Sequence, residues 1–447
     1  MSKQSERLYD GITGVSDELI ESAQKRPKRW GLRRLWGPVA AILVIAVLCG
    51  VVLTRGGLNA YAVAEAEYPR KAVHPYGEFY GGGYDFLSAS VPELLSGAGE
   101  ENRVYSPINL FMSLSMLAEL TGGETREQIL ALLGAEDLTE QREAANKVWN
   151  ANYTTERGRC VLANSIWLDR EIEYNKATLN TLAGNYYASS YSGETGSRGY
   201  DNALRKWLND QTGGLLRQQT GQLSMDPDTV LTLASTVSFR GTWSDEFKKS
   251  DTYPQTFHAP AGDRSCDFMH MERMRGLYCW GERFSAVVKH FTNGRSMWFL
   301  LPDEGVSMDE LVNDPECLSL LSKDRSGSPN SRAMYINLAL PRFDLDSDLD
   351  LREALGDLGV TDAFMQGTAD FSPLTADTDV YVSQARQAAR VRIDEEGCTA
   401  AAYIAIMGAG ASEPPTEEID FTLDRPFLFA ITYLDQLPLF VGVVNDP

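Results

Sequence analysis

Hydrophobic residues recur at helical spacing in the first part of the chain. The segment 109–120 is apolar on most faces, which predicts a buried helix. Thr125 and Gln128 have the spacing of a capping box and predict the start of the next helix, which Gly134 would end. A further helix is expected over 204–216, where the pattern runs into two glycines.

The later part of the chain has the patterns of strands. Residues 230–239 are almost continuously apolar, which is typical of a central strand. Apolar side chains at every second position from 334 to 340 predict a half-buried strand, and 296–302 and 438–444 predict two more. Helices followed by strands indicate an α+β fold with large sheets.

One apolar run stands apart from these patterns. Gly37–Leu53 has no charged residue and is about long enough to cross a thin bilayer. The cationic block Lys25–Arg34 precedes it and is expected to stay in the cytoplasm. We therefore predict an uncleaved single-pass membrane helix. A cleaved secretory signal, or a lipoprotein site at Cys49, are the alternatives.

The predicted span divides the chain into four parts. No second linker and no internal repeat follows residue 76, which favours one large domain. The parts are a cytoplasmic tail over 1–36, a transmembrane anchor over 37–53, a linker over 54–75 and an extracellular domain over 76–447.

The charge of the chain narrows its possible partners. The net charge is −21, although residues 1–55 carry nine Lys or Arg against five Asp or Glu. The remainder is thus more acidic than the whole and would repel the phosphates of nucleic acid. A nucleic-acid partner is not expected, whereas basic protein partners are compatible with this surface.

The sequence contains no recognisable catalytic or cofactor motif. It has four histidines and lacks the zinc-protease, nucleophile-elbow, phosphate-loop and dinucleotide patterns. The six cysteines show no CxxC pair, and Cys398 is interpreted as a small hydrophobe rather than a reactive thiol. We predict no metal, no cofactor and no enzymatic activity.

Six segments stand out along the chain: NRVYSPINLFMSLSMLAELTGGETREQILALLG (102–134), STVSFRGTWSDEF (235–247), FLLPDEG (299–305), LPRFDLDSDLDLREALGDLGVTDAF (340–364), DFSPL (370–374) and FTLDRPFLFAI (421–431). In this order and with this spacing they resemble the serpins, a family of serine protease inhibitors, and the resemblance covers residues 76–447.

The resemblance implies a single serpin-like domain with three β-sheets, about eight to nine helices and an exposed reactive loop. It also implies suicide inhibition, in which a serine protease cleaves the loop and the freed segment inserts as a strand into the central sheet. The hinge and inserting loop would comprise Glu395, Glu396, Gly397, Cys398, Thr399, Ala400, Ala401, Ala402, Tyr403 and Ile404.

The loop residues are compatible with insertion. In a strand, alternate side chains share a face, so Cys398, Ala400, Ala402, Ile404 and Ile406 would be buried together without a charge among them. The other face would hold 399, 401, 403, 405 and 407. Fifteen residues from 397 to 411 would span roughly 50 Å as a strand.

The usual family spacing from the hinge places the cleaved bond at Ala411–Ser412, with Met407 and Ala409 as further candidates. Counting back from the C-terminal motif instead places it near Pro415, where proline is disfavoured. A small residue at the cleaved position predicts an elastase-like or subtilisin-like serine protease, and cysteine proteases stay possible targets. We expect the protein to be a monomer.

The chain departs from the family pattern where the central sheet would open. The sheet-opening residues are Ser106, Asn109, Ser235, Trp243 and Gln387. Of these, Asn109, Ser235 and Gln387 replace the usual serine, asparagine and histidine, and all three can still form hydrogen bonds. Tyr403 is bulkier than the usual hinge residue. A serpin-fold binding or structural protein without inhibitory activity is the alternative function.

Overall fold

The computed structural model describes residues 60–69, 82–154, 160–221, 223–322, 330–376, 380–398, 415–433 and 437–447. The predicted tail (1–36), the predicted transmembrane segment (37–53) and the loop residues 399–414 lie outside these ranges. Within them, no helix combines the length and the hydrophobicity needed to cross a membrane.

The chain forms two compact units. The first contains the described residues up to Glu65 together with Ser165–Ile172 and Ser189–Ala234. The second contains Ala66–Asn164, Glu173–Ala188 and Ser235–Pro447.

The first unit is built on a small sheet and one long helix. Tyr200 and Leu204 of α9 pack with Trp167 in its core, and Gly213 ends α9 in a left-handed conformation, as a glycine stop requires. Part of the predicted linker, with its alternating Ala, Tyr and Val, pairs as strand β1 with β4. The elements are β1 (Ala60–Ala64), β4 (Ala188–Gly193), β3 (Cys160–Asp169) and β5 (Leu231–Phe239) in sheet order, with α9 (Arg198–Thr212) and α10 (Arg217–Thr220). β3, β4 and β5 each contain residues of both units.

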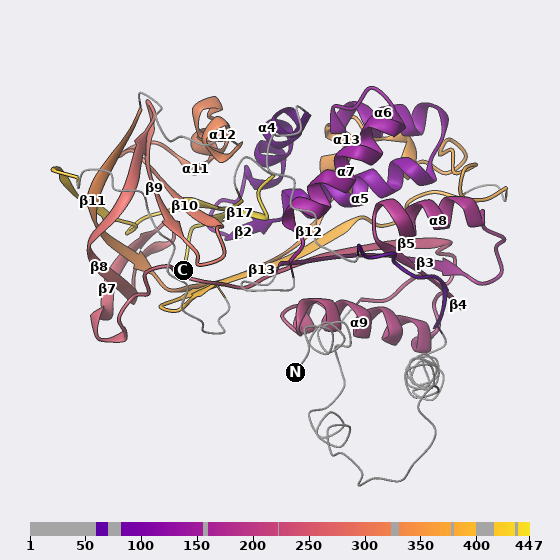
Figure 1. Cartoon of the computed structure of the whole chain (residues 1–447), viewed down its shortest axis with the longest axis horizontal. Coiled ribbons are helices and arrows are strands. Elements are labelled where there is room, and N and C mark those ends of the chain that lie inside the picture. Colours follow the sequence, from indigo (N-terminus) through magenta and orange to yellow (C-terminus); the bar gives the residue numbers. More distant parts are fainter. Residues whose placement is uncertain are drawn as a thin grey trace, which may run out of the picture. The chain divides into compact units, whose positions relative to one another are not determined.

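The second unit contains a nine-stranded sheet (Figure 1). The strands expected from alternation at 334–340 and from the apolar runs at 296–302 and 438–444 all belong to it. In sheet order the strands are β15 (Glu418–Thr422), β11 (Ser331–Pro341), β8 (Gly262–Trp280), β9 (Phe284–His290), β10 (Ser296–Pro302), β16 (Phe427–Thr432), β17 (Phe440–Val444) and β2 (Arg103–Tyr105), with β7 (Thr252–Ala259) paired to β8.

A second sheet of this unit has a short strand at its centre. Its order is β12 (Phe343–Asp350), β13 (Arg386–Asp394), β14 (Gly397–Cys398) and β6 (Gly241–Thr242). β13 pairs with β12 over eight residue pairs, whereas β14 pairs with β13 over two. Among the described residues, no other strand pairs with the β14 side of β13.

Helices of the second unit gather on one side of β12 and β13 in the view of Figure 1. The predicted buried helix is α5, whose side chains are almost all inaccessible to solvent. The helices are α4 (Gly82–Leu95), α5 (Pro107–Leu120), α6 (Gly123–Leu133), α7 (Leu138–Asn152), α8 (Lys176–Asn185), α11 (Met308–Val312), α12 (Pro315–Ser322) and α13 (Arg352–Asp357).

The described residues thus form three sheets and ten α-helices, seven of which have at least seven residues. The three sheets agree with the expectation, and the helix count exceeds the expected eight to nine when short helices such as α10 and α11 are included. One local prediction is wrong. α6 begins at Gly123, with Gly122 at the N-cap and no side-chain cap, because Thr125 and Gln128 instead accept hydrogen bonds from the main chain of Asp370 and Thr361.

Candidate functional site: the hinge and the sheet-opening network

The predicted hinge forms a tight hairpin at the end of β13. Asp394 closes the turn, because its Oδ1 accepts hydrogen bonds from the main-chain N–H groups of Glu396 (3.0 Å) and Gly397 (3.3 Å). β14 then lies between β13 and β6 and is antiparallel to both. The pairs are Ile393↔Cys398 and Asp394↔Gly397 on one side, and Thr242↔Gly397 and Gly241↔Cys398 on the other.

Only glycine fits at position 397. Gly397 has φ of +143°, which L-residues rarely adopt. A Cβ atom there would lie 2.1 Å from the carbonyl oxygen of Gly241. The close backbone approach that places β14 in the sheet therefore depends on this residue.

The segment Trp243–Phe247, which we call the hinge clasp, holds the carbonyl groups of the turn. The main-chain N–H groups of Trp243 and Phe247 donate to the carbonyls of Glu396 (3.0 Å) and Glu395 (3.1 Å). The Trp243 indole Nε1 donates to the carbonyl of Asp394 at 3.0 Å. The indole is buried and stacks on Phe291, with ring centroids 4.3 Å apart. This packing holds the Trp243 end of the clasp in position.

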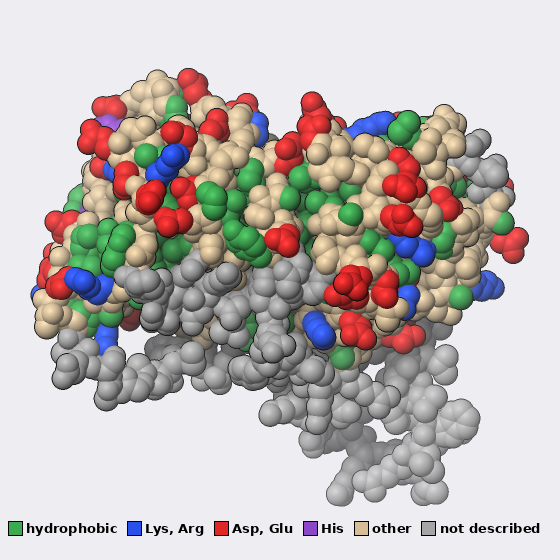
Figure 2. All heavy atoms as spheres, turned by 90° about the horizontal axis from the view of Figure 1, so that it is seen from above, with side chains coloured by type: hydrophobic (Ala, Val, Ile, Leu, Met, Phe, Trp, Pro, Cys, Tyr) green, Lys and Arg blue, Asp and Glu red, His purple; other side chains and the backbone are tan. Residues whose placement is uncertain are grey.

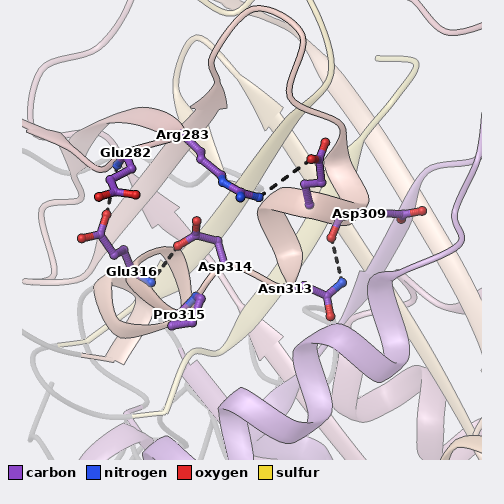
Figure 3. A pocket seen from close by; sticks show the side chains of 8 residues that line it. Glu282, Arg283, Asp309, Asn313, Asp314, Pro315 and Glu316 are labelled. Atoms are coloured by element: carbon purple, nitrogen blue, oxygen red, sulfur yellow. Dashed lines mark hydrogen bonds and ion pairs between the residues drawn. The ribbon is translucent and has the colours of Figure 1, made fainter.

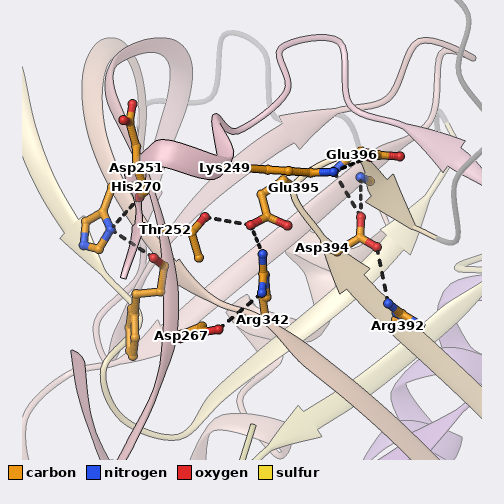
Figure 4. A network of polar contacts seen from close by, with 12 residues as sticks. Lys249, Asp251, Thr252, Asp267, His270, Arg342, Arg392, Asp394, Glu395 and Glu396 are labelled. Carbon is orange, nitrogen blue, oxygen red and sulfur yellow. Dashed lines mark hydrogen bonds and ion pairs between the residues drawn. The ribbon is translucent and has the colours of Figure 1, made fainter. Parts of the chain in front are cut away.

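Charged groups surround the same turn (Figure 4). Glu395 is buried, its carboxylate pairs with Arg342, and it accepts a 2.8 Å hydrogen bond from Thr252. Arg342 also pairs with Asp267 at 3.2 Å. Burial raises the pKa of Glu395, but the hydrogen bonds from Arg342 and Thr252 outweigh it and lower the pKa overall. The neighbouring Glu396 points outward to Lys249 at 2.9 Å.

A second, uncharged set of contacts joins β13 to α5. Gln387 is buried, and its Oε1 accepts a hydrogen bond from the Ser106 N–H at 2.8 Å. Its Nε2 donates to the Ser106 carbonyl at 3.2 Å. Ser106 is the N-cap of α5, because its hydroxyl accepts from the Asn109 N–H. The side chain of Gln387 therefore pairs both main-chain groups of the residue that caps α5.

The same network continues from α5 to two strands. The Asn109 side-chain amide donates to the carbonyl of Ser235 at 3.0 Å. The Ser235 hydroxyl lies 2.7 Å from Asn164 Oδ1, and Asn164 Nδ2 donates to the Tyr186 carbonyl at 2.8 Å. We call Ser106, Asn109, Asn164, Ser235 and Gln387 the sheet-opening network. Asn109, Ser235 and Gln387, the three replaced residues, are all hydrogen-bonded within it.

The structure brings the sequence-predicted residues together in two groups, since Glu395–Cys398 meet Trp243 at the hinge and Ser106, Asn109, Ser235 and Gln387 meet in the network. The other predicted loop residues lie outside the described ranges: Thr399, Ala400, Ala401, Ala402, Tyr403, Ile404, Met407, Ala409, Ala411 and Ser412.

Sequence reasoning missed Arg342, Thr252 and Asn164. Asn164 had a signal, because it and Ser165 are polar residues inside a largely apolar strand. Arg342 and Thr252 had none, since an Arg and a Thr at strand ends are ordinary surface residues.

The acidic hollow beside α11 and α12 shows no comparable assembly (Figure 3). Asp314 caps α12 by accepting from the Glu316 N–H at 2.7 Å, and Glu310 forms a capping box with Ser307. These carboxylates are engaged in local structure rather than converging on a common point. Within the described ranges, no group of three or more His, Cys, Asp or Glu side chains is placed to hold a metal ion.

Comparisons with known proteins agree on one family. The sequence model described as "Serpin (serine protease inhibitor)" matches residues 85–447. The chain is 26% identical to serine proteinase inhibitor A3K of Cavia porcellus over 91% of this chain and 97% of that protein, and 28% identical to Serpin-Z2A of Oryza sativa subsp. japonica over 82% and 97%.

Solved structures show the same fold. The native state of the thermophilic serpin tengpin superposes with a TM-score of 0.74 at 24% identity, covering 87% of this chain and all of tengpin. The complex of thyroxine-binding globulin with thyroxine gives a TM-score of 0.69 at 20% identity, covering 81% and 98%. The hinge hairpin, the fold and the family match lead to one conclusion: the chain belongs to the serpin family.

Proposed function

We propose that this protein is a serine protease inhibitor that acts as a suicide substrate, tethered at the outer face of a cell membrane. The observation that carries the proposal is β14. Two hinge residues already pair with β13 and β6 as an antiparallel strand, in the register that a longer inserted strand would continue.

The burial of Cys398 gives the direction of that continuation. Cys398 is 3% exposed, and it pairs across the sheet with Ile393, which is also buried. Because side chains alternate along a strand, Ala400, Ala402, Ile404 and Ile406 would follow Cys398 into the interior. All are small or aliphatic, so insertion would leave no polar side chain buried without a partner.

The edge of β13 is compatible with such a strand. β13 has nine residues, and β14 pairs only with Ile393 and Asp394 of them. An inserted segment would add main-chain hydrogen bonds along the remaining edge, and this gain would drive the conversion.

The proposed reaction begins with attack of the protease serine on the Ala411 carbonyl. The bond to Ser412 breaks, the new amino group leaves with the C-terminal segment, and Ala411 stays esterified to the protease. Insertion of 397–411, which spans roughly 50 Å as a strand, would then carry the enzyme away before water hydrolyses the ester. A small residue at the cleaved position favours elastase-like or subtilisin-like enzymes.

The proposed tether and partner charge rest on composition. The apolar run Gly37–Leu53 follows a cationic block, which favours a cytoplasmic N-terminus and an extracellular body. Asp and Glu side chains are spread over the face drawn in Figure 2, so a target with basic surroundings would be favoured electrostatically. The protein is expected to act as a monomer.

The test mixes the purified chain with an elastase-type protease and separates the products on a denaturing gel. We expect an adduct that survives heat and detergent, together with a released peptide that begins at Ser412. Ala402→Arg would place a charge on the buried face and should give cleavage without an adduct. Ala401→Arg, on the opposite face, is the matched control and should still give the adduct.

Cleavage without an adduct by the unmodified chain, across a panel of serine proteases, would contradict the inhibitory function. That outcome would favour a binding role, of the kind the thyroxine complex of the related fold illustrates. For the tether, protease treatment of intact cells should remove the domain from the surface and leave the segment before residue 37 protected.

A further inference from the structure

A buried lysine lies directly beneath the hinge clasp. Lys289 of β9 is 2% exposed. Its Nζ lies 4.6 Å from the ring centroid of Phe247 and 5.3 Å from that of Trp243. It donates a 2.6 Å hydrogen bond to the main-chain carbonyl of Asp245. Lys289 therefore contacts the first, middle and last residues of the clasp.

This lysine has no ion pair among the described residues, because no carboxylate oxygen there lies within 4.0 Å of its Nζ. Its other polar neighbours are the sulfur atoms of Met271 (3.4 Å) and Met274 (4.0 Å), which are weak acceptors. Fully buried lysines without a paired acid are rare, since burial of an ammonium is costly. The site offers a charge the carbonyl of Asp245, the two ring faces and, from beyond ion-pair distance, the Asp245 carboxylate.

The surroundings make the charge of Lys289 responsive near neutral pH. Burial lowers the pKa of Lys289 to about 7, and attraction to Asp245 only partly opposes this. His290, next to it on β9, is the other titratable group that acts here. The residue is solvent-exposed overall, but partial desolvation of its ring and then the Lys289 charge lower its pKa. The facing residues on β8 are methionines, and Met297 is its pair on β10.

We propose that Lys289 is a positioning residue for the hinge, and that its charged form holds the clasp closed against the turn at Asp394–Glu396. The clasp has two sides. Its N–H groups face the hinge carbonyls, while its rings and the Asp245 carbonyl face Lys289. A change in the strength of the contacts between Lys289 and the clasp should therefore alter the hydrogen bonds from the clasp to the hinge carbonyls.

The direction follows from the two protonation states. The ammonium makes a charge-assisted hydrogen bond and attracts the faces of Trp243 and Phe247. The neutral amine keeps only a weaker hydrogen bond. The clasp should thus loosen as pH rises through about 7. Resting on the proposed function, the consequence is that loop insertion starts more readily on the alkaline side, since the hinge is where insertion begins.

The experiment measures hydrogen exchange of the main-chain N–H groups in 243–247 of the full chain between pH 6 and 8.5, corrected for intrinsic exchange rates. We expect protection of Trp243 and Phe247 to fall about tenfold across this range, the size of a lost charge-assisted contact. Lys289→Met fits among the neighbouring methionines and should make the corrected profile flat. Lys248→Met, which removes an exposed lysine one residue beyond the clasp, should leave it unchanged.

If Lys289→Met keeps the wild-type dependence of protection on pH, the proposal is overturned. Lys289 would then have only a packing role, and its loss would change protection by the same factor at every pH. If Lys289→Met does not fold, Phe247→Leu gives the second test. Loss of one ring should lower the midpoint by roughly half a pH unit, and an unmoved midpoint would contradict the assignment.

A second readout separates this inference from the inhibitory function. The fraction of protease trapped as covalent adduct should rise between pH 6 and 8 in the wild type and stay constant in Lys289→Met. If no adduct forms at any pH while the exchange profile shows the expected step, the inhibitory function is contradicted and the role of Lys289 at the hinge is supported.

Discussion

The hinge clasp and the sheet-opening network hold the same strand, β13, through different kinds of interaction. The clasp engages the end of β13 at Asp394, with a buried acid, a partly exposed arginine and a lysine close by. The network engages Gln387, seven positions earlier on β13, through neutral amides and hydroxyls that are almost all buried. Changes of pH and salt can therefore act on the clasp, whereas the network responds to the loss of hydrogen-bonding partners.

The difference assigns separate roles to the two regions. Arg342 is 40% exposed, so its attraction to Glu395 is moderated by solvent. Solvent does not moderate the hydrogen bonds of a neutral buried network in this way. Each group that loses its partner there costs its full desolvation energy. We expect the network to set how firmly β13 is fixed to α5 and the clasp to set when the hinge opens.

The largest effect should come from Gly397→Ala, which disrupts the backbone packing of the hinge next to the clasp and changes no charged residue. The new Cβ would lie 2.1 Å from the Gly241 carbonyl oxygen, in a backbone conformation with φ of +143°. β14 should leave its place between β13 and β6, and the free energy of unfolding should fall by about 4 kcal/mol. Chemical denaturation measures this loss.

Gly262→Ala provides the control for backbone strain alone. Gly262 also has positive φ (+122°), but no atom lies within 4 Å of the position of its Cβ. Its substitution should cost only about 1–2 kcal/mol. Equal losses in the two variants would show that the close approach to Gly241 does not hold β14 in place.

The next effect should come from the network, with Gln387→Leu. The substitution leaves both main-chain groups of Ser106 without their side-chain partner in a buried site. Such loss costs about 3 kcal/mol for two groups, and it should be nearly independent of pH between 5 and 9, since neither partner titrates there. Gln387→His, which can pair one of the two groups, should recover part of the loss; no recovery would indicate that volume rather than hydrogen bonding matters at this position.

Much of the fold could be predicted from periodicity, because long elements have strong patterns. The buried helix at 109–120 and the strands at 230–239 and 334–340 occur where the apolar spacing placed them. The capping box at Thr125 could not be judged in this way, because its side chain is used by Asp370, a partner 245 residues away. Local signals cannot reveal competition by distant segments.

The site shows the same limit more sharply. The hinge glycine could be located from the sequence through the resemblance to the serpins, whose hinge is an acidic segment followed by glycine. The partner of Glu395 could not, because Arg342 lies 53 residues away and its ion pair depends on β12 and β13 being neighbours. The role inferred for Lys289 likewise requires the rings of Trp243 and Phe247 to meet it in space.

A smaller, pH-dependent effect should distinguish the two acids of the hinge. Glu395→Gln removes a buried charge beside Arg342 and should cost about 2 kcal/mol at pH 7, discounted because the arginine is partly exposed. Because the folded-state pKa of Glu395 is lowered, its contribution is complete above about pH 5 and disappears as pH falls through the folded value. Wild type and variant should therefore converge in acid-unfolding curves once the pH is below the lowered folded-state pKa of Glu395.

Glu396→Gln is the matched control, since its carboxylate is 45% exposed and its lysine partner 71%. The expected loss is below about 0.5 kcal/mol. A loss at position 396 as large as at 395 would contradict the view that burial, rather than charge alone, makes the hinge turn sensitive to acid.

The smallest effect should come from exchanging two residues inside the network. Asn109→Ser removes the amide that donates to the Ser235 carbonyl and should cost about 1 kcal/mol. Ser235→Asn alone adds an amide to a site already occupied by Asn109 and Asn164, and should cost a similar amount through crowding. In the double variant the side-chain amide is carried by position 235 of β5 instead of position 109 of α5. The two losses of stability should therefore not add, and we expect a coupling energy between the two positions of at least about 0.5 kcal/mol. If the losses of unfolding free energy measured by denaturation are strictly additive, the two positions are independent. The sheet-opening network would then consist of separate contacts rather than one coupled unit.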